Sequence, residues 1–344
     1  MKTVIEKCDG SGLSNQALCN AAQILQRGGL VVFPTETVYG LGGDATSGDA
    51  AKKIYEAKGR PSDNPLIIHI SAPEDAEGYA ETSELYYKLA KAFMPGPLTI
   101  ILPKKDTIPS SVTGGLDSVA VRCPSHPVAR QLISEFGKPI AAPSANLSGK
   151  PSPTCAKYVI EDLDGRVDMI IDGGDCEIGL ESTIIKLSGN KATLLRPGAI
   201  TADALSCVCE SVEIARAVLE QLKENERPLS PGMKYRHYAP SVSFVLVDGE
   251  QQNVVNFLKE EQKRKKCAVL CYHEEMAMLN GQGLIDIGSS DDLEAQAKKL
   301  FTALRDADAL GVEVIYAHLP SKDGIGLALY NRMIRAAAHT VIKV

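Results

Sequence analysis

Residues 30–70 read LVVFPTETVYGLGGDATSGDAAKKIYEAKGRPSDNPLIIHI. The pattern predicts an apolar strand over 30–33, a polar loop over 34–42, a helix over 49–58 and a second strand over 66–70. Lys58 and Arg60 stand in the second connection, close to Asn64 and two prolines. Because ligands of open α/β sheets bind outside the strand ends, we interpret this stretch as part of a rigid cradle for an anion.

The bulk composition is typical of a soluble globular protein. The chain has 344 residues, of which 44% are apolar and 23% are charged, and its length predicts about two domains. The formal net charge of −6 argues against stable nucleic-acid binding, because proteins that hold the nucleic-acid backbone usually carry a basic excess. The first residues do not resemble a signal peptide, and no run of about 18 apolar residues occurs. We therefore expect a cytoplasmic protein that does not enter a membrane.

The cysteine pattern argues against a zinc site and against a disulfide framework. Nine cysteines are scattered along the chain, and no CxxC pair is present. Free cysteines are among the residues most often buried, so we expect reduced and mostly buried thiols.

Strands and helices alternate through the first part of the chain, and some strands are adjacent. Helices are predicted over 14–28, 83–93 and 127–136 and from 154, and strands over 98–102, 119–122, 140–142, 169–172, 183–187 and 192–195. This order predicts an α/β domain over 1–210, with a twisted mixed sheet and covering helices.

A different pattern begins after residue 210. Residues 230–240 read SPGMKYRHYAP, which has no periodicity and predicts a linker or lid within 211–240. Strands over 242–247, 268–272, 284–287 and 312–317 then alternate with helices that reach 265 and that span 293–309 and 323–341. We expect a smaller, Rossmann-like, doubly wound domain over 241–344.

The usual phosphate-binding glycine motifs are missing, so an anion would require side-chain cations. The sequence contains no G-x-x-x-x-G-K-[ST], and Gly40-Leu41-Gly42-Gly43 lacks the G-x-G-x-x-G spacing. Lys58 and Arg60 are candidates, and Arg122 and Arg196 each end a predicted strand. Lys58 and Arg60 are equally well explained as solvated cations at the C-terminus of a helix.

Other polar residues have simple structural explanations when they are taken singly. His69 lies within an apolar strand and is explained as a core histidine. Ser144 and Asn146 are typical of a cap or turn, and Ser182 of a strand edge. Cys123 has no neighbouring base in the sequence, which argues against a thiol nucleophile.

Seven short motifs occur together in a fixed order. They are Pro34–Leu41, Lys58–Pro61 with Asn64–Leu66, Met94–Thr99, Val121–Arg122 with Pro124, Pro143–Gly149, Glu181–Thr183 and Arg196–Gly198. This ordered set resembles the YrdC-type family of threonylcarbamoyl-AMP synthases. The linker and the small α/β domain after it resemble the long, two-domain form of that family, so the resemblance covers essentially the whole chain.

The resemblance implies an enzyme that joins L-threonine, bicarbonate and ATP into threonylcarbamoyl-AMP and releases pyrophosphate. The product would supply a separate transferase complex that modifies the tRNA adenosine beside the anticodon. Carried over to matching positions, the threonine-binding residues are Thr37, His69, Arg122 and Ser182. The ATP-binding residues are Lys58, Arg60, Asn64, Thr113, Ser144, Asn146, Ser152 and Arg196, with Lys58 and Arg60 also catalytic. Tyr235 and Tyr238 would cover the filled pocket as a lid.

The implied reaction depends on positioning the two substrates and on offsetting the charge of the phosphates, and it requires no covalent enzyme intermediate. An N-carboxylate of threonine would attack the α-phosphorus of ATP, with Mg²⁺ carried by ATP and no dedicated metal site in the protein. Glu36 is a candidate general base by its position alone. Two rival functions are a carbamoyl-adenylate-forming enzyme, which the missing CxxC pairs disfavour, and an RNA-binding module, which the 5% aromatic content disfavours.

Overall fold

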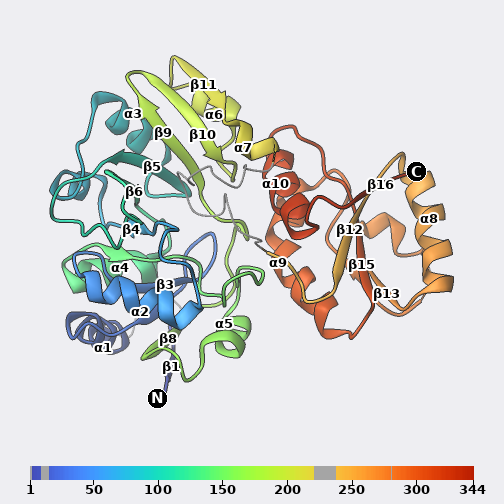
Figure 1. Cartoon of the computed structure of the whole chain (residues 1–344), viewed down its shortest axis with the longest axis horizontal. Coiled ribbons are helices and arrows are strands. Elements are labelled where there is room, and N and C mark those ends of the chain that lie inside the picture. The colour runs from blue at the N-terminus through green and yellow to red at the C-terminus, as the bar shows by residue number, and fades with distance from the viewer. Residues whose placement is uncertain (1, 9–14, 221–237, 280) are drawn as a thin grey trace. The chain divides into compact units, whose positions relative to one another are not determined.

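The structure is a computed structural model that describes residues 2–8, 15–220, 238–279 and 281–344 (Figure 1). The described residues form two compact units. The first comprises 2–8, 15–148, 152–177 and 181–220, and the second comprises Gly149–Pro151, Ile178–Leu180, 238–279 and 281–344.

The first unit is built on an 11-stranded mixed sheet, counted over the described residues. In sheet order its strands are β1 (Val4–Lys7), β8 (Met169–Asp172), β2 (Val31–Phe33), β3 (Gly40–Asp44), β7 (Ile140–Ala141), β4 (Ile67–His69), β6 (Ser118–Arg122), β5 (Leu98–Pro103), β9 (Thr183–Ser188), β10 (Lys191–Arg196) and β11 (Ser211–Ile214). Neighbours run both parallel and antiparallel, which confirms the predicted mixed α/β sheet.

Helices of the first unit pack against this sheet. They are α1 (Asn15–Gln26), α2 (Gly48–Lys58), η1 (Pro73–Gly78), α3 (Glu84–Phe93), α4 (Pro127–Phe136), α5 (Ala156–Leu163), α6 (Ala202–Ser206) and α7 (Arg216–Leu219). The apolar faces of α1 and α4 form one buried cluster with β2 and β8, in which Leu18, Leu132 and Phe33 are fully buried. Burial of these faces, more than helix propensity, stabilises helices of this length.

One element of the organising stretch was predicted wrongly. The predicted loop over 34–42 ends at Tyr39, because Gly40–Asp44 form strand β3, which pairs antiparallel with β2. A Cβ atom on Gly42 would lie 2.6 Å from Ile140 and 2.8 Å from Phe33, so the packing of this strand requires glycine. Because glycine is depleted in strands, the glycine-rich sequence of β3 did not indicate a strand.

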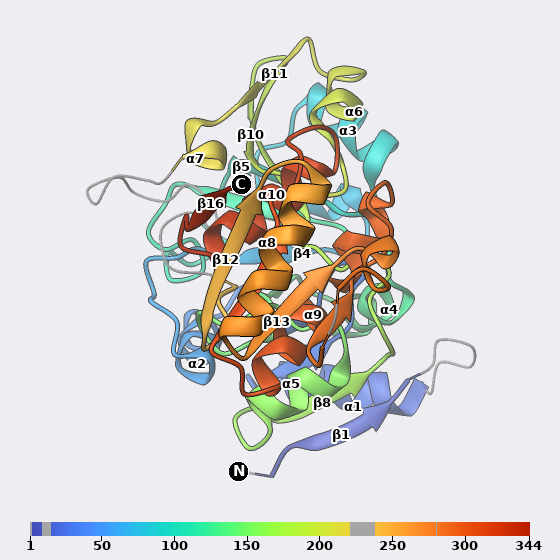
Figure 2. The same ribbon diagram turned by 90° about the vertical axis from the view of Figure 1, so that its right-hand side faces the viewer.

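The second unit is a parallel sheet with helices on both faces. In the described part of this unit, the strands lie in the order β14 (Leu284–Asp286), β13 (Cys267–Cys271), β15 (Val314–His318), β12 (Ser243–Asp248) and β16 (Val341–Lys343). Helix α8 (Gln251–Arg264) covers one face, in front of β12 and β13 in Figure 2, while α9 (Leu293–Ala309) and α10 (Gly326–Ala336) lie on the other face in Figure 1. The predicted Rossmann-like arrangement is confirmed.

The last predicted helix is too long. It was expected to reach residue 341, but α10 ends at Ala336 and the chain returns as β16. Ala338 and His339 have φ angles of 46° and 63°, which lie in the left-handed region and end the helix. Neither residue is a glycine or asparagine, so the sequence contains no conventional stop signal there.

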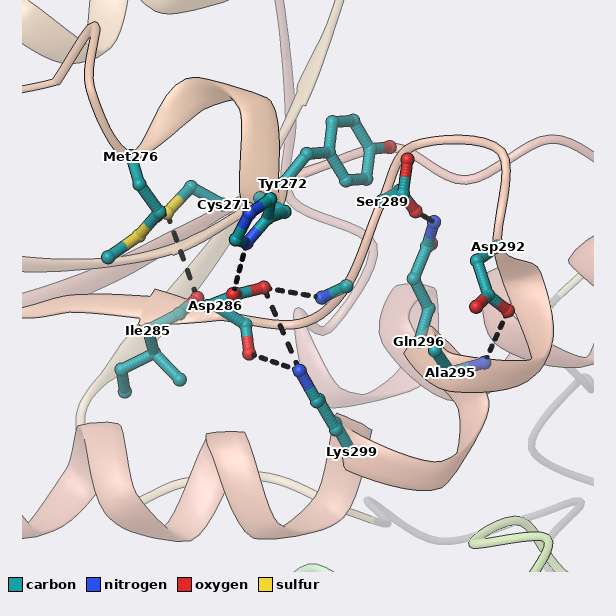
Figure 3. A network of polar contacts seen from close by, with 12 residues as sticks. Cys271, Tyr272, Met276, Ile285, Asp286, Ser289, Asp292, Ala295, Gln296 and Lys299 are labelled. Atoms are coloured by element: carbon teal, nitrogen blue, oxygen red, sulfur yellow. Dashed lines mark hydrogen bonds and ion pairs between the residues drawn. The ribbon is translucent and has the colours of Figure 1, made fainter.

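Polar side chains meet at the carboxyl end of β14. Asp286 accepts a hydrogen bond from the Gly288 amide at 2.7 Å, and it lies 2.8 Å from Nδ1 of His273 and 3.7 Å from Nζ of Lys299 (Figure 3). The hydrogen bond with His273, then the one from Gly288, holds the pKa of Asp286 below its usual range. Through Lys299, these contacts connect the carboxyl end of β14 to residues 293–309.

Two short segments from the first part of the chain belong to the second unit. Arg305 of α9 donates two hydrogen bonds to the Pro151 carbonyl, at 3.1 and 2.6 Å, and the Ala239 amide donates to the Gly149 carbonyl at 2.9 Å. The predicted boundaries 1–210, 211–240 and 241–344 stay a prediction, because 221–237 lie outside the described residues.

Substitution of Gly179 by alanine is expected to destabilise the second unit strongly. Its φ is 80°, and an added Cβ would lie 2.4 Å from the Lys298 Cα in α9. The backbone of α9 cannot move aside as a flexible side chain would. We therefore expect the free energy of unfolding to fall by well above the ~1 kcal/mol cost of a left-handed alanine alone. Gly174→Ala is the matched control, because its φ is 84° and its Cβ would meet nothing within 4 Å. Equal melting temperatures for the two variants would contradict this account.

Candidate functional site

Four of the predicted site residues and one unpredicted threonine lie along a single row of neighbouring strands in the first unit. His69 of β4 pairs in register with Arg122 of β6, and Arg122 pairs with Thr99 of β5. The Thr99 hydroxyl is 2.7 Å from the Ser182 hydroxyl, just before β9. Arg196, at the end of β10, donates to that Ser182 hydroxyl at 3.1 Å and to the Ser182 carbonyl at 3.0 Å.

The connection between β2 and β3 closes this row from one side. The Thr35 hydroxyl accepts hydrogen bonds from the amides of Thr37 and Val38, both at 3.2 Å, and donates to the Val38 carbonyl at 2.6 Å. Thr35 therefore shapes the loop. Thr37 instead accepts a hydrogen bond from Nη2 of Arg122 at 2.8 Å, which places the predicted threonine-binding residue in the row.

Arg122 is the central cation of the row, and it is buried. Its Nη2 atom is 2.8 Å from Oε1 of Glu36, in an ion pair whose side chains are 5% and 3% exposed. Nε of Arg122 and both carboxylate oxygens of Glu36 lack a hydrogen-bond partner of good geometry among the described residues. Because a buried unsatisfied polar group costs about 1–3 kcal/mol, such atoms together indicate a place where a polar ligand binds.

His69 is buried and is held in its neutral form. Burial, and secondly the positive charge of Arg122, lowers its pKa to about 3. Its ring lies edge-on to Phe33, with centroids 6.1 Å apart, and Nδ1 has no hydrogen-bond partner among the described residues. A neutral imidazole offers one N–H donor and one acceptor, which suits recognition of a hydroxyl group.

The pKa of His69 predicts acid sensitivity. The unfolded chain takes up the proton near pH 6.5 but the folded protein only near pH 3, so the contribution of neutral His69 to stability is complete above 6.5 and declines as pH falls. Between pH 6.5 and 3, each unit by which the pH falls lowers the free energy of unfolding by up to ~1.4 kcal/mol. Urea unfolding at pH 7, 6, 5 and 4 should therefore show a shallower decline for His69→Gln than for the wild type. Parallel declines for the two proteins would refute the conclusion that the burial of neutral His69 causes the acid sensitivity.

A second group of predicted residues surrounds the end of α2. Lys58 is only 2% exposed, and its ammonium group donates to the backbone carbonyls of Ser144 and Asn146. The Ser144 hydroxyl donates to Oδ1 of Asn146. Lys58 thereby holds the loop after β7 against α2. The sequence had suggested only an anion-binding cation or a solvated cation at a helix end.

Arg60 lies beyond the helix end, where Gly59 takes up a left-handed cap with φ 64°. Its guanidinium group donates to the Pro65 carbonyl at 3.2 Å and to the Asn64 carbonyl at 3.4 Å. Asn64 is 2% exposed, and its Oδ1 atom has no hydrogen-bond partner among the described residues. Thr113 lies near this loop, since the amide of Leu66 donates to the Val112 carbonyl at 2.9 Å.

Backbone hydrogen bonds join the two groups. The Tyr39 carbonyl accepts from the Ala145 amide at 2.8 Å, and the Tyr39 amide donates to the Pro153 carbonyl at 3.0 Å. The neighbouring Ser152 hydroxyl donates to Oε1 of Glu181 at 2.7 Å. All twelve predicted threonine- and ATP-binding residues lie in the first unit.

The predicted lid residues are not part of this group. Tyr235 lies outside the described residues. Tyr238 is 5% exposed and stacks on Phe301, with ring centroids 5.2 Å apart, inside the second unit. Its role as a lid stays a prediction.

Three residues of the site were missed or left unassigned by sequence reasoning. Thr99 and Glu181 contact the predicted residues Ser182 and Ser152, and Glu36 pairs with Arg122. Thr99 and Glu181 lie within the recognised motifs Met94–Thr99 and Glu181–Thr183, so motif membership was the available signal. Their partners become visible only once the strands are paired.

The cysteines fit the expectation of buried thiols. All nine lie among the described residues, where none forms a disulfide, and Cys207 alone is exposed. Burial raises the pKa of Cys123 to about 11, so its thiolate is scarce at neutral pH and the argument against a thiol nucleophile is strengthened.

The described residues contain neither a metal-ligand cluster nor a membrane-spanning helix. No three side chains among His, Cys, Asp and Glu gather there as ligands for a metal ion. No helix in the described part of the chain is long and apolar enough to cross a membrane.

Comparison with known proteins gives matches over nearly the whole chain. The model of the Sua5/YciO/YrdC family, described as "Telomere recombination", matches residues 23–198. A second model, described as "Threonylcarbamoyl-AMP synthase, C-terminal domain", matches residues 200–338.

Curated relatives and a solved structure agree with these models. The threonylcarbamoyl-AMP synthase of Bacillus subtilis is 44% identical, with 98% of each chain covered, and that of Pyrococcus abyssi is 45% identical, with 94% and 95% covered. The crystal structure of P. abyssi Sua5 complexed with L-threonine has a TM-score of 0.91 at 43% identity, covering 99% of this chain and 100% of that one. This match confirms the predicted fold class of both units.

Proposed function

The chain belongs to the two-domain form of the threonylcarbamoyl-AMP synthase family of nucleotidyltransferases. We therefore propose that it joins L-threonine, bicarbonate and ATP into threonylcarbamoyl-AMP and releases pyrophosphate. One observation of the site supports this most strongly. Of the seven buried side-chain atoms without a hydrogen-bond partner among the described residues, five belong to Glu36, Asn64, His69 and Arg122 in the first unit, and the other two belong to Gln262 and His318 in the second. Such a set is complementary to a small substrate with charged and hydroxyl groups.

Threonine is proposed to bind along the row that contains Arg122. The guanidinium group suits the substrate carboxylate, because its fork of N–H donors matches two carboxylate oxygens. Neutral His69 and the hydroxyl groups of Thr37 and Ser182 are then available to the threonine side chain. Recognition by paired hydrogen bonds rejects an analogue that lacks the hydroxyl group.

ATP is proposed to bind where the end of α2 meets the loop after β7. Lys58, Arg60 and Arg196 supply positive charge, while Asn64, Thr113, Ser144, Asn146 and Ser152 supply amide and hydroxyl groups. These residues are donors for phosphate and nucleoside oxygens and include no carboxylate that would hold a metal ion. Mg²⁺ would therefore be held by the triphosphate itself and would offset its charge.

The reaction proceeds without a covalent enzyme intermediate. The N-carboxylate of threonine attacks the α-phosphorus, the bond from that phosphorus to the bridging oxygen breaks, and pyrophosphate leaves. Charge grows on the phosphate oxygens in the transition state, so Lys58 and Arg60 accelerate the step by fixed positive charge and position. Burial of the row around Arg122 keeps water from the N-carboxylate.

The product is proposed to serve a separate tRNA-modifying transferase complex in the cytoplasm. The reduced cysteines support an intracellular setting, since disulfides are rare there. The net charge of −6 supports a protein that supplies a small molecule and does not itself bind tRNA stably.

The direct test is pyrophosphate release by the purified protein with ATP, Mg²⁺ and bicarbonate. We expect release to require L-threonine, and we expect L-serine, which lacks one methyl group, to be roughly 10–200-fold poorer by kcat/KM. Release that is the same with and without threonine would refute the proposed function.

A further inference from the structure

Glu36, a candidate general base by its position in the sequence, is a buried carboxylate to which the steps proposed above assign no contact with substrate. Its side chain is 3% exposed, and among the described residues its ion pair is formed by Oε1 and Nη2 of Arg122, 2.8 Å apart. Neither of its oxygens accepts a hydrogen bond of good geometry from the described residues, although an ionised carboxylate offers about four acceptor positions.

An unsatisfied buried carboxylate requires a donor, and the substrate is the available source. Arg122 and Glu36 present a positive and a negative group 2.8 Å apart. A zwitterionic α-amino acid presents the opposite pair, a carboxylate and an ammonium group joined by one carbon atom. If the substrate carboxylate binds Arg122, the ammonium group of the same molecule lies within reach of Glu36 and supplies the missing N–H donors.

We propose that Glu36 binds the ammonium group of threonine and accepts the proton that this group must lose before it is carboxylated. The inference rests on the proposed function, because it assigns a part of the same reaction. Glu36 is then a catalytic residue, and its pairing with Arg122 in the absence of substrate keeps both charges compensated.

The proton transfers balance as follows. The ammonium N–H bond breaks, its electron pair stays on nitrogen, and the proton passes to Glu36. Glu36 gives this proton to the hydroxyl group of bicarbonate, which leaves as water and yields CO2. The nitrogen lone pair then forms the N–C bond to CO2, and Glu36 accepts the second proton from the adduct and releases it to solvent. No oxidant or further reactant is needed.

A purely structural role for Glu36, as a support for Arg122, makes a different prediction. In that case its loss weakens every ligand that uses Arg122, with or without an amine. Calorimetric titration with L-threonine and with (R)-3-hydroxybutanoate, which keeps the carboxylate and the hydroxyl group but lacks the amine, separates the two roles.

Glu36→Gln is expected to weaken threonine binding roughly tenfold or more, the effect of losing a hydrogen bond to a charged group, and not to weaken binding of hydroxybutanoate. Equal losses for both ligands would overturn the proposal. Glu135→Gln, at an exposed position of α4, is the matched control, and melting curves check that each variant is folded. Wild-type protein that binds no threonine would refute the proposed function instead.

A pH profile gives a second readout. Without the carboxylate, the variant depends on threonine that is already deprotonated in solution, so its rate of pyrophosphate release should rise roughly tenfold per pH unit below the pKa of the free amine. The wild type should show a flatter profile over the same range, and the difference should disappear at high pH. Parallel profiles for the two proteins would exclude a proton-accepting role.

Discussion

Arg122→Met is expected to abolish threonine-dependent pyrophosphate release and to lower the free energy of unfolding by about 3–5 kcal/mol. The loss of stability follows from the ion pair, since the variant leaves the Glu36 carboxylate buried at 3% exposure without its cation. The loss of activity follows from the missing guanidinium fork, for which a thioether offers no donor.

A double variant separates the two effects. Glu36→Gln combined with Arg122→Met removes both charges, so most of the lost stability should return while threonine binding stays absent. Urea unfolding measures the first quantity and calorimetric titration the second. Threonine binding by the double variant at wild-type affinity would show that Arg122 does not hold the substrate.

Arg60→Ala is expected to reduce pyrophosphate release by about two orders of magnitude or more, the typical cost of removing one donor that stabilises transition-state charge. The structure shows Arg60 half-buried, with its fork turned toward the Asn64 and Pro65 carbonyls. Those contacts hold the side chain beside Asn64, whose Oδ1 atom is unsatisfied among the described residues. Most of the loss should appear in kcat, because the charge it offsets develops during the reaction.

Two further variants sharpen this prediction. Arg60→Lys keeps the charge but loses the planar fork, so its rate should fall between those of the wild type and Arg60→Ala. Lys52→Ala removes an exposed cation from α2, the helix that precedes Arg60, where Lys52 pairs with Asp49 at 3.0 Å, and should leave the rate unchanged. If Arg60→Ala retains the wild-type rate, Arg60 does not stabilise the transition state.

Much of the fold could be predicted from the sequence, because residues that favour the start or the end of a helix mark the bounds of its elements. Helix α2 begins at a Ser47 cap and ends at Gly59, and α4 begins with Pro127 and ends at Gly137. Such signals act over a few residues and need no tertiary context. Strand β3 and the end of α10 escaped prediction for the converse reason, since packing around Gly42 and left-handed residues at 338 and 339 override local preference.

The candidate site residues likewise came from the sequence, through an ordered set of motifs that matched one family, and their binding roles stay a prediction. The roles within the site were less accessible. His69 is the clearest case, because its position in an apolar strand indicates a core residue, whereas its pKa and its pairing with Arg122 come from burial and sheet register.

The sequence by itself determined most helices, most strands, the order of the motifs and the candidate cations, because these depend on residue type and short spacing. The tertiary structure decided that His69, Arg122, Thr99, Ser182 and Arg196 form one row, that Lys58 holds the loop after β7, and that Glu36 lies against Arg122. These relations join residues far apart in the chain, and strand pairing brings them together at distances that no local pattern encodes.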